Sequence, residues 1–332
     1  MTPFIRFWFA SATKRSAVGA VVLLASFACA SVLAQTYPVK PIKIIVPYPP
    51  GGGADQMARL VASKLTVTLG QSIIVENQSG GATMIGTGAA ARAAPDGYTL
   101  LVSGNVMPVN VLITKTPSYK VADFAPVAGI GSYPYVLTMN PAVPVGNITE
   151  LIGYAMKNPG KLNAVSLGPG GVTHLLTERF AAAAGIKIVP VHYRGAAPGL
   201  IDLLSGQVQL FLDAANTALP QVRGGKLRAM AVSSESRFAL LPEVPTLKEI
   251  GLPAMTQSGW FAMFAPAGTP KAIVDKLNAE VIKAVSAADV DAQFGQRGLA
   301  AMPLSPEAFT TFMLEDAARW EQTLRTLNIS LE

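Results

Sequence analysis

Short segments rich in β-branched residues alternate with amphipathic helical patterns, and this alternation limits the folds open to the chain. The first strand is expected at 42–47. A helix should follow at 54–69, where Met57, Val61 and Leu65 fall on one face, and Gly70 is expected to end it. Alternating strands and helices are typical of α/β layers with largely parallel strands, so we expect the α/β class.

The same alternation continues toward the end of the sequence. Further strands are expected at 72–76, 98–103, 164–167, 188–192, 209–213, 227–232 and 260–265. Further helices are expected at 148–158, 172–184, 197–205, 270–287 and 306–326.

The first 34 residues have the composition of an export signal. Basic residues come first, 17–28 is an apolar run of about 12 residues, and 32–34 offers small residues before a cut. We expect export, with cleavage after Ala34. A transmembrane anchor is the alternative, but it needs about 20 apolar residues. A lipid anchor at Cys29 is a second alternative, for which Ser26 to Ala28 is a poor context.

Removing 34 residues from 332 leaves 298, which exceeds the size at which single cores usually stop growing. Two lobes are therefore expected. No long charged or Ser/Gly-rich linker separates them. We therefore expect lobes that are joined by crossover strands, with a ligand cleft between them.

Charge and cysteine content exclude several functions. The segment 1–34 holds three of the 26 basic residues, so the remainder has 23 basic against 20 acidic residues, a net charge of +3. These charges are scattered, which argues against nucleic acid and mildly favours anionic small ligands. The segment after 34 has no cysteine and only His174 and His192, so neither a metal site nor a cofactor is expected.

A glycine cluster between the first strand and the first helix is the sharpest local signal. Gly51, Gly52 and Gly53 let the backbone approach a ligand, and the helix that follows presents unpaired N–H groups. This geometry suits an anion. No Gly-Lys-Ser/Thr follows, so it is not a nucleotide-phosphate loop. The alternative is a rigid turn with Asp55 in the first helical turn.

A second cluster at 166–174 again joins a strand to a helix. Gly168, Gly170 and Gly171 would form another cradle, and Ser166 and Thr173 would add hydroxyl donors for a reversibly bound carboxylate. His174 begins the helix and either contacts the ligand or is structural.

Two further strand-to-helix turns lie at 193–198 and 211–216. Ligands in open α/β sheets bind outside the carboxyl ends of the strands, so all four turns are expected at one rim. Arg194 either binds an anion or forms a surface ion pair. Asp213 would repel a carboxylate, so within the cleft it should orient backbone N–H groups or bind an amine.

Enzyme motifs are absent from the sequence. No Gly-x-Ser-x-Gly elbow occurs, and neither histidine has an obvious serine and acid around it, which argues against a hydrolase. Gly86-Thr87-Gly88 matches part of a dinucleotide fingerprint, but it lies in a helical stretch. Close helix packing is the simpler interpretation.

The sequence resembles the Bug-type substrate-binding receptors of tripartite tricarboxylate transporters. The resemblance runs from about Tyr37 to Glu332 and rests on many short matches spread along the chain. They lie at 37–42, 46–52, 69–71, 75–77, 95–100, 158–163, 202–208, 225–229 and 265–270.

This resemblance implies a two-lobed periplasmic binding protein fold of type II. Lobe 1 would be 35–138 plus 259–332, and lobe 2 would be 139–258. The family holds its ligand carboxylate largely through backbone groups and water, at the turns that match 51–55 and 166–174 here. Tyr48 lies in the matched segment 46–52. The positions that match cleft-lining positions of the family are Ser103, Gly104, Asn105 and Asp213.

The chain departs from the family pattern at two places. Gly171 replaces the usual Ser or Thr, which removes a side-chain hydrogen bond to the ligand. The run 78–82, Gln-Ser-Gly-Gly-Ala, replaces the commoner Arg-Pro-Gly-Ala-Gly.

We therefore expect a monomeric, non-enzymatic periplasmic receptor that captures a small carboxylate and delivers it to membrane permease subunits of a tripartite transporter. An extracytoplasmic ligand sensor for a signalling partner is the main alternative, and a hydrolase is the second.

Overall fold

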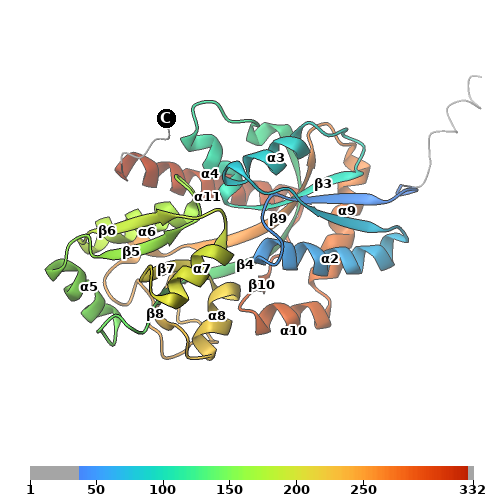
Figure 1. The fold of residues 1–332 in the computed structure, drawn as a ribbon. Coiled ribbons are helices and arrows are strands. Elements are labelled where there is room, and N and C mark those ends of the chain that lie inside the picture. The colour runs from blue at the N-terminus through green and yellow to red at the C-terminus, as the bar shows by residue number, and fades with distance from the viewer. Residues whose placement is uncertain (1–36, 328–332) are drawn as a thin grey trace, which may run out of the picture. The chain divides into compact units, whose positions relative to one another are not determined.

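The computed structural model describes residues 37–327, so the expected signal at 1–34 and its cleavage after Ala34 lie outside the described residues. Internal contacts divide the chain before Lys40, and the larger unit contains all the elements named below (Figure 1). The strands are β1 (Ile42–Val46), β2 (Ile73–Asn77), β3 (Thr99–Gly104), β4 (Phe124–Met139), β5 (Leu162–Ser166), β6 (Ile188–His192), β7 (Leu210–Ala214), β8 (Arg228–Val232), β9 (Ser258–Pro266) and β10 (Ala300–Ala301). The α-helices are α2 (Gly53–Leu69), α3 (Met84–Ala91), α4 (Val106–Ile113), α5 (Ile148–Lys157), α6 (Val172–Ala184), α7 (Ala196–Ser205), α8 (Ala215–Arg223), α9 (Lys271–Val285), α10 (Ala288–Gln296) and α11 (Pro306–Leu327).

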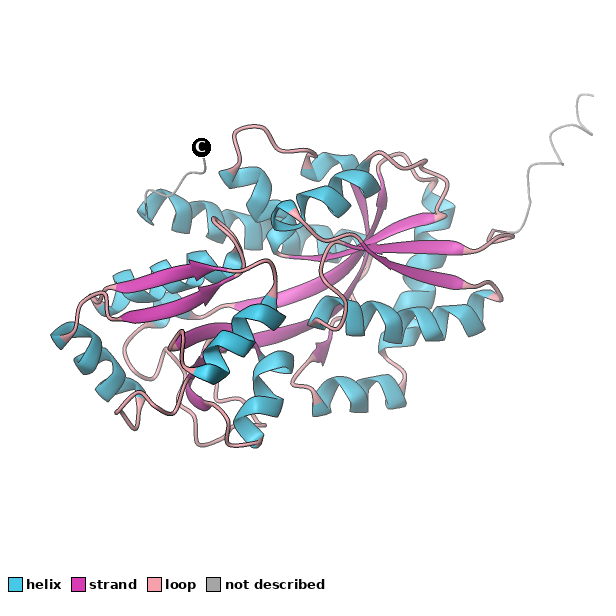
Figure 2. Cartoon of the chain, in the orientation of Figure 1, coloured by secondary structure: helices cyan, strands magenta, loops and turns pink. Residues whose placement is uncertain are grey.

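The described strands connect in the order β2-β1-β3-β9-β4-β7-β5-β6, with β8 and β10 also paired to β4. Helices flank the strands on both sides, which confirms the α/β class (Figure 2). The expectation of largely parallel strands is only partly correct. Pairing is parallel within β2-β1-β3 and within β6-β5-β7, but the pairs that β4 and β9 make with other strands are antiparallel.

Strand β4 links the two parallel groups. Its first part, from Phe124 to Pro134, pairs with β9, and its last part, from Tyr135 to Met139, pairs with β7. This is the arrangement expected of a crossover strand. The lobe boundaries 35–138 plus 259–332 and 139–258 stay a prediction.

The core beside β9 contains a buried acidic side chain. Trp260 and Phe264 pack with Phe309 of α11 in one apolar cluster. Asp316, also on α11, is 1% exposed and accepts hydrogen bonds from Trp260 Nε1 (2.9 Å) and Gln257 Nε2 (2.8 Å). These hydrogen bonds and the ion pair with Arg319 (3.1 Å) offset the cost of burying the carboxyl group, so α11 can pack tightly against the strands.

Two local predictions from glycine are confirmed. Gly70 adopts the left-handed conformation at φ 65° and ends α2. Gly86 lies in helix α3, where a Cβ would be 3.0 Å from Pro47 Cβ, so the glycine does serve close packing. No helix in the described residues is long and apolar enough to cross a membrane.

Candidate functional site

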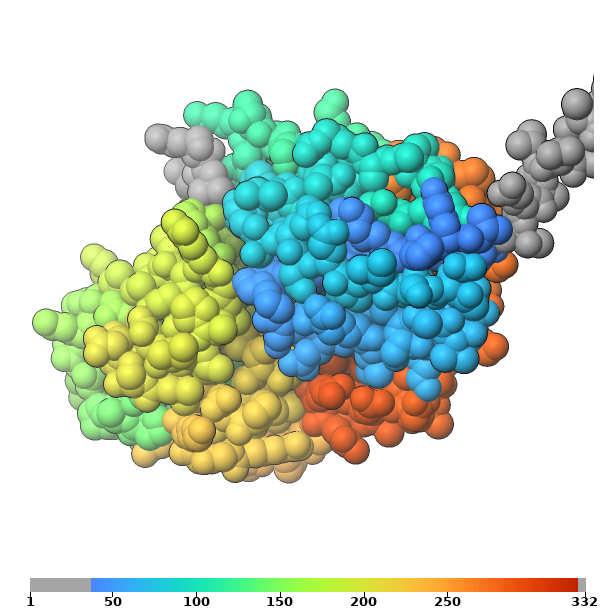
Figure 3. All heavy atoms as spheres, turned by 45° about the vertical axis from the view of Figure 1, so that its right-hand side comes forward, coloured from blue at the N-terminus to red at the C-terminus, as the bar shows by residue number. Residues whose placement is uncertain are grey.

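The four predicted turns all follow the carboxyl ends of strands, and several of them touch one another. The Tyr193 N–H donates to Ser166 O (2.8 Å), which joins the second and third turns. A Cβ at Gly195 would lie 2.9 Å from Pro49 Cγ, so the third turn packs against the first. Figure 3 shows these two segments, yellow and blue, against each other. Three of the four predicted turns therefore lie together.

The first glycine turn leads into α2 without a capping side chain. Gly52 is the N-cap, and the first helical hydrogen bond runs from the Gln56 N–H to Gly52 O (3.0 Å). The N–H groups that precede Gln56 have no acceptor within the helix, as at any helix start. Together with the helix dipole they favour an anion.

Asp55 maintains the shape of this turn. It is 3% exposed and accepts from the Gly51 N–H (2.9 Å), from Arg59 Nε (3.0 Å) and from Asn77 Nδ2 (2.9 Å). Burial alone would raise its pKa, but these hydrogen bonds outweigh it and lower the pKa. The carboxylate is therefore ionised and engaged with the protein.

The predicted residues at the end of β3 are buried. Ser103 is fully buried, and among the described residues its hydroxyl has no hydrogen-bond partner. Asn105 Nδ2 donates to the Tyr135 hydroxyl on β4 (3.1 Å). Tyr48 is half-buried and its ring meets Phe261 edge-on. Burial raises the pKa of Tyr48 to about 12, so the phenol is neutral.

The second glycine turn is held by its own side chains. Ser166 Oγ donates to Gly168 O (3.1 Å), and Thr173 Oγ1 accepts from the Leu167 N–H (2.8 Å). Gly168 (φ 124°) and Gly170 (φ 68°) take conformations that favour glycine. Gly171 is buried and caps α6. Ser166 and Thr173, which were predicted as hydroxyl donors to the ligand, thus form hydrogen bonds within the turn itself.

His174 stabilises the same turn from α6. Its Nδ1 accepts from the Gly170 N–H (2.9 Å), and its ring meets His192 edge-on. Burial lowers the pKa of His174, and His192 lowers it further, so the ring is neutral at pH 7. An acceptor at Nδ1 requires this neutral form.

His192 and Arg194 lie on the more exposed side of the rim. His192 Nδ1 is 2.9 Å from Ser166 Oγ, an arrangement that sequence reasoning missed because the residues are distant in the chain. The Ser166 hydroxyl is fully buried, and no described carboxylate is hydrogen-bonded to His192. Arg194 is exposed, and none of the ion pairs found in the described residues includes it.

Asp213 lies at the end of β7 and orients the fourth turn. It is 5% exposed, accepts from the Ala214 N–H (2.8 Å) and is also hydrogen-bonded by the Thr217 hydroxyl. This agrees with the expected role of orienting backbone N–H groups. Burial raises the pKa of Asp213 to about 6.

Asn216 in α8 was not predicted as a site residue. A Cβ at Gly53 would collide with its amide nitrogen and lie 3.1 Å from its Oδ1, so the fourth turn meets the start of α2. Nothing in the sequence pattern separates Asn216 from an ordinary residue near a helix start. Its role depends on a contact between distant segments.

A strained turn lies beside the second glycine turn. Ala82 (φ 51°) and Thr83 (φ 78°) adopt positive φ without being glycine, which costs about 1–2 kcal/mol each. Ala82 Cβ would be 3.9 Å from a Cβ at Gly168, and Asn110 Nδ2 donates to Ala82 O (2.6 Å). Such strain concentrates at functional sites.

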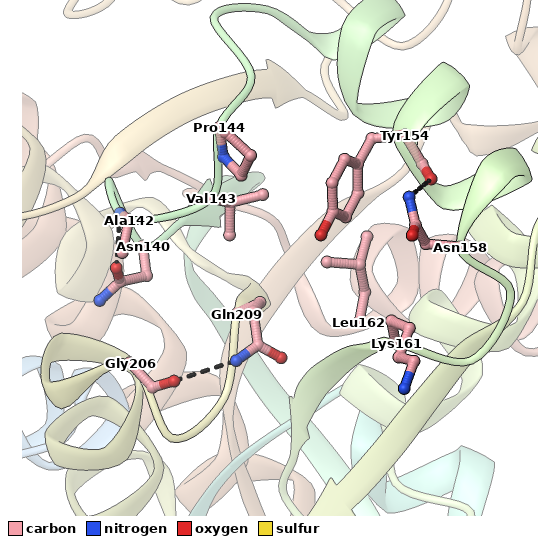
Figure 4. Close-up of a pocket in the computed structure, with 10 residues that line it drawn as sticks. All are labelled: Asn140, Ala142, Val143, Pro144, Tyr154, Asn158, Lys161, Leu162, Gly206 and Gln209. Atoms are coloured by element: carbon pink, nitrogen blue, oxygen red, sulfur yellow. Dashed lines mark hydrogen bonds between the residues drawn. The ribbon is translucent and has the colours of Figure 1, made fainter.

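A pocket of about 420 Å³ lies elsewhere, between the end of β4 and the start of β5 (Figure 4). None of the predicted site residues lines it. Gln209 Nε2 donates to Gly206 O (3.0 Å) and Asn158 Nδ2 donates to Tyr154 O (2.9 Å), so these amides are already paired. Among the described residues, no group of three or more His, Cys, Asp or Glu is placed to hold a metal ion.

Comparisons with known proteins agree on one family. The family described as "Tripartite tricarboxylate transporter family receptor" matches residues 57–329. Protein BugT of Bordetella pertussis is 36% identical over 96% of this chain and 99% of its own length.

Two solved structures from Rhodopseudomonas palustris are similar over nearly their whole length. Rpa4515 with adipate has a TM-score of 0.85 and 32% identity, and covers 89% of this chain and 99% of its own. MatC with bound malate has a TM-score of 0.82 and 31% identity, and covers 87% of this chain and 100% of its own. These similarities confirm the Bug-type resemblance and the two-lobed periplasmic binding protein fold.

Proposed function

Because the chain belongs to the receptor family of tripartite tricarboxylate transporters, we propose that it captures a small carboxylate between two lobes and delivers it to permease subunits. The family and its solved neighbours are solute-binding proteins. One observation carries the proposal: the uncapped start of α2 meets the fourth turn, from a distant part of the sequence, at Gly53 and Asn216. A ligand held at both would link both lobes.

The proposed site uses the turns at this rim. Unpaired backbone N–H groups at the starts of α2 and α6 bind the carboxylate, while Asp55, Asp213 and His174 keep the turns in shape. The site comprises Tyr48, Gly51, Gly52, Gly53, Asp55, Ser103, Asn105, Ser166, Gly168, Gly170, Gly171, Thr173, His174, Arg194 and Asp213.

Several finer features belong to the same proposal. The protein works as an exported periplasmic monomer that is cleaved after Ala34, and it catalyses no reaction. Support against hydrolysis comes from Ser166, whose hydroxyl is fully buried and engaged with Gly168 O. N-terminal sequencing of the protein from the periplasmic fraction tests the cleavage site.

A thermal-shift screen tests carboxylate capture. The exported protein is unfolded and refolded to remove co-purified ligand, then screened against mono-, di- and tricarboxylates and aromatic acids. Ligand at about 100 times its dissociation constant adds roughly 2.7 kcal/mol, which raises the melting temperature by several degrees. No shift with any acid would refute the proposal.

A further inference from the structure

Asn216 is a buried polar side chain without a protein partner. It lies in the first turn of α8 and is 7% exposed. Neither Nδ2 nor Oδ1 makes a hydrogen bond within the described part of the chain. Leaving a buried amide unpaired costs about 1–3 kcal/mol, which a purely structural residue would avoid.

The Asn216 amide lies over the uncapped start of α2. A Cβ at Gly53 would collide with Asn216 Nδ2 and lie 3.1 Å from Oδ1, so only glycine leaves this space. Gly52, the N-cap, provides no side-chain hydrogen bond to the helix. The unpaired Asn216 amide therefore lies beside the unpaired N–H groups in the first turn of α2.

We propose that Asn216 recognises a hydrogen-bond donor, a hydroxyl or an ammonium group, that the bound carboxylate carries next to its carboxyl group. This inference rests on the proposed function. It makes Asn216 a specificity-determining residue of the same site.

The chemistry of the amide leads to this class of ligand. A carboxylate accepts hydrogen bonds only, so it satisfies the α2 N–H groups and Asn216 Nδ2 but leaves Oδ1 unpaired. A donor substituent beside the carboxyl group satisfies Oδ1. Asp213 is the weaker acceptor for this group, because the Ala214 N–H and the Thr217 hydroxyl already donate to its two oxygens, whereas Asn216 Oδ1 accepts no hydrogen bond from the described residues.

Calorimetric titration with matched acids tests the inference. Each set differs only in the substituent beside the carboxyl group: succinate, malate and aspartate, or propionate, lactate and alanine, or phenylacetate, mandelate and phenylglycine. The wild-type protein should bind the hydroxy or amino member at least about tenfold more tightly than the unsubstituted acid. The preferred member identifies the donor.

Variants separate recognition from folding. Asn216→Leu, and Asn216→Ala if the larger side chain prevents folding, should remove the preference while the unliganded protein melts at an equal or higher temperature. Asn158→Leu, the same change at a paired amide in the other pocket, should keep the preference. Equal binding of substituted and unsubstituted acids by the wild type, or a preference that survives in both Asn216 variants, would overturn the inference. If no acid binds at all, the proposed function itself fails.

Discussion

Asp213 carries a charge that burial disfavours. Its pKa is raised from 3.8 to about 6 by burial, against hydrogen bonds that act in the other direction. A raised folded-state pKa contributes stability below pH 3.8, and this contribution is lost as the pH rises through about 6. At neutral pH the wild-type protein is therefore less stable than it would be with a neutral isostere at this position.

We predict that Asp213→Asn makes the free energy of unfolding less sensitive to pH in this range. From pH 4 to pH 7 the wild type should lose about 2 kcal/mol relative to the variant, because one pKa unit corresponds to about 1.36 kcal/mol and part of the loss has already occurred at pH 4. Urea unfolding of both proteins at several pH values measures the difference. Parallel curves would show that Asp213 is not desolvated in the folded protein.

Single residues also mark where sequence-based prediction succeeded and where it stopped. Glycine turns were predictable, because positive φ and close approach to ligand depend on the local sequence, as at Gly168 and Gly170. Contacts between distant segments were not, as Asn216 and the proximity of His192 to Ser166 show. These contacts depend on how strands far apart in sequence come together.

Helix α6 couples the second glycine turn to pH through His174. The ring accepts from the Gly170 N–H, and its neighbours are His192 and Glu178. Because the folded-state pKa lies below 6.5, its contribution to stability is complete above pH 6.5 and is lost as the pH falls. Protonation also removes the acceptor for Gly170.

We predict that ligand affinity falls by about tenfold as His174 becomes protonated. His174→Asn places an oxygen near the position of Nδ1, so affinity should become insensitive to pH below 6.5. His174→Leu has no acceptor and should bind weakly at every pH. Titrations between pH 5 and pH 8 distinguish the three proteins, and an unchanged pH profile in the Asn variant would contradict this role.

Strand β4 was the longest element that sequence patterning missed; helices α4, α8 and α10 and the short strand β10 were missed as well. Pro126, Gly129, Gly131 and Pro134 interrupt the alternation of β4, and the structure shows register shifts against β9 at Pro126/Ala128 and at Gly129/Gly131. Proline and glycine inside a strand weaken the usual signal. The regular strands β1, β5 and β6 lack such interruptions and were placed within a few residues.

At the scale of the whole molecule, the contact between the first and fourth turns depends on the missing side chain at Gly53. A Cβ there would meet the Asn216 amide, whereas a Cβ at Gly52 would meet only Pro49 O, at an ordinary 3.7 Å. A side chain at Gly53 would therefore fill the space between the first and fourth turns, whereas a side chain at Gly52 would not.

We predict that Gly53→Ala weakens ligand binding at least about tenfold, because the crowded contact costs about 1–3 kcal/mol. In the unliganded protein the helix propensity of alanine should offset part of this cost, so the loss of stability should be smaller than the loss of binding free energy. Gly153→Ala in α5, where a Cβ would meet nothing within 4 Å, is the control and should change affinity little. Calorimetry and thermal melting of both variants provide the comparison, and equal affinities would rule out this contact as a determinant of binding.

The path of β4 has a consequence for the order of folding. Phe124 of β4 pairs with Pro266 of β9, so this part of the sheet forms only after the long segment between them has been made. Strands β5, β6 and β7 follow one another closely and pair locally. Contacts between distant residues slow folding. The middle of the chain should therefore acquire protection from amide hydrogen exchange before the strands at β1 and β9 do, and the binding rim, which needs both, should be the last part completed.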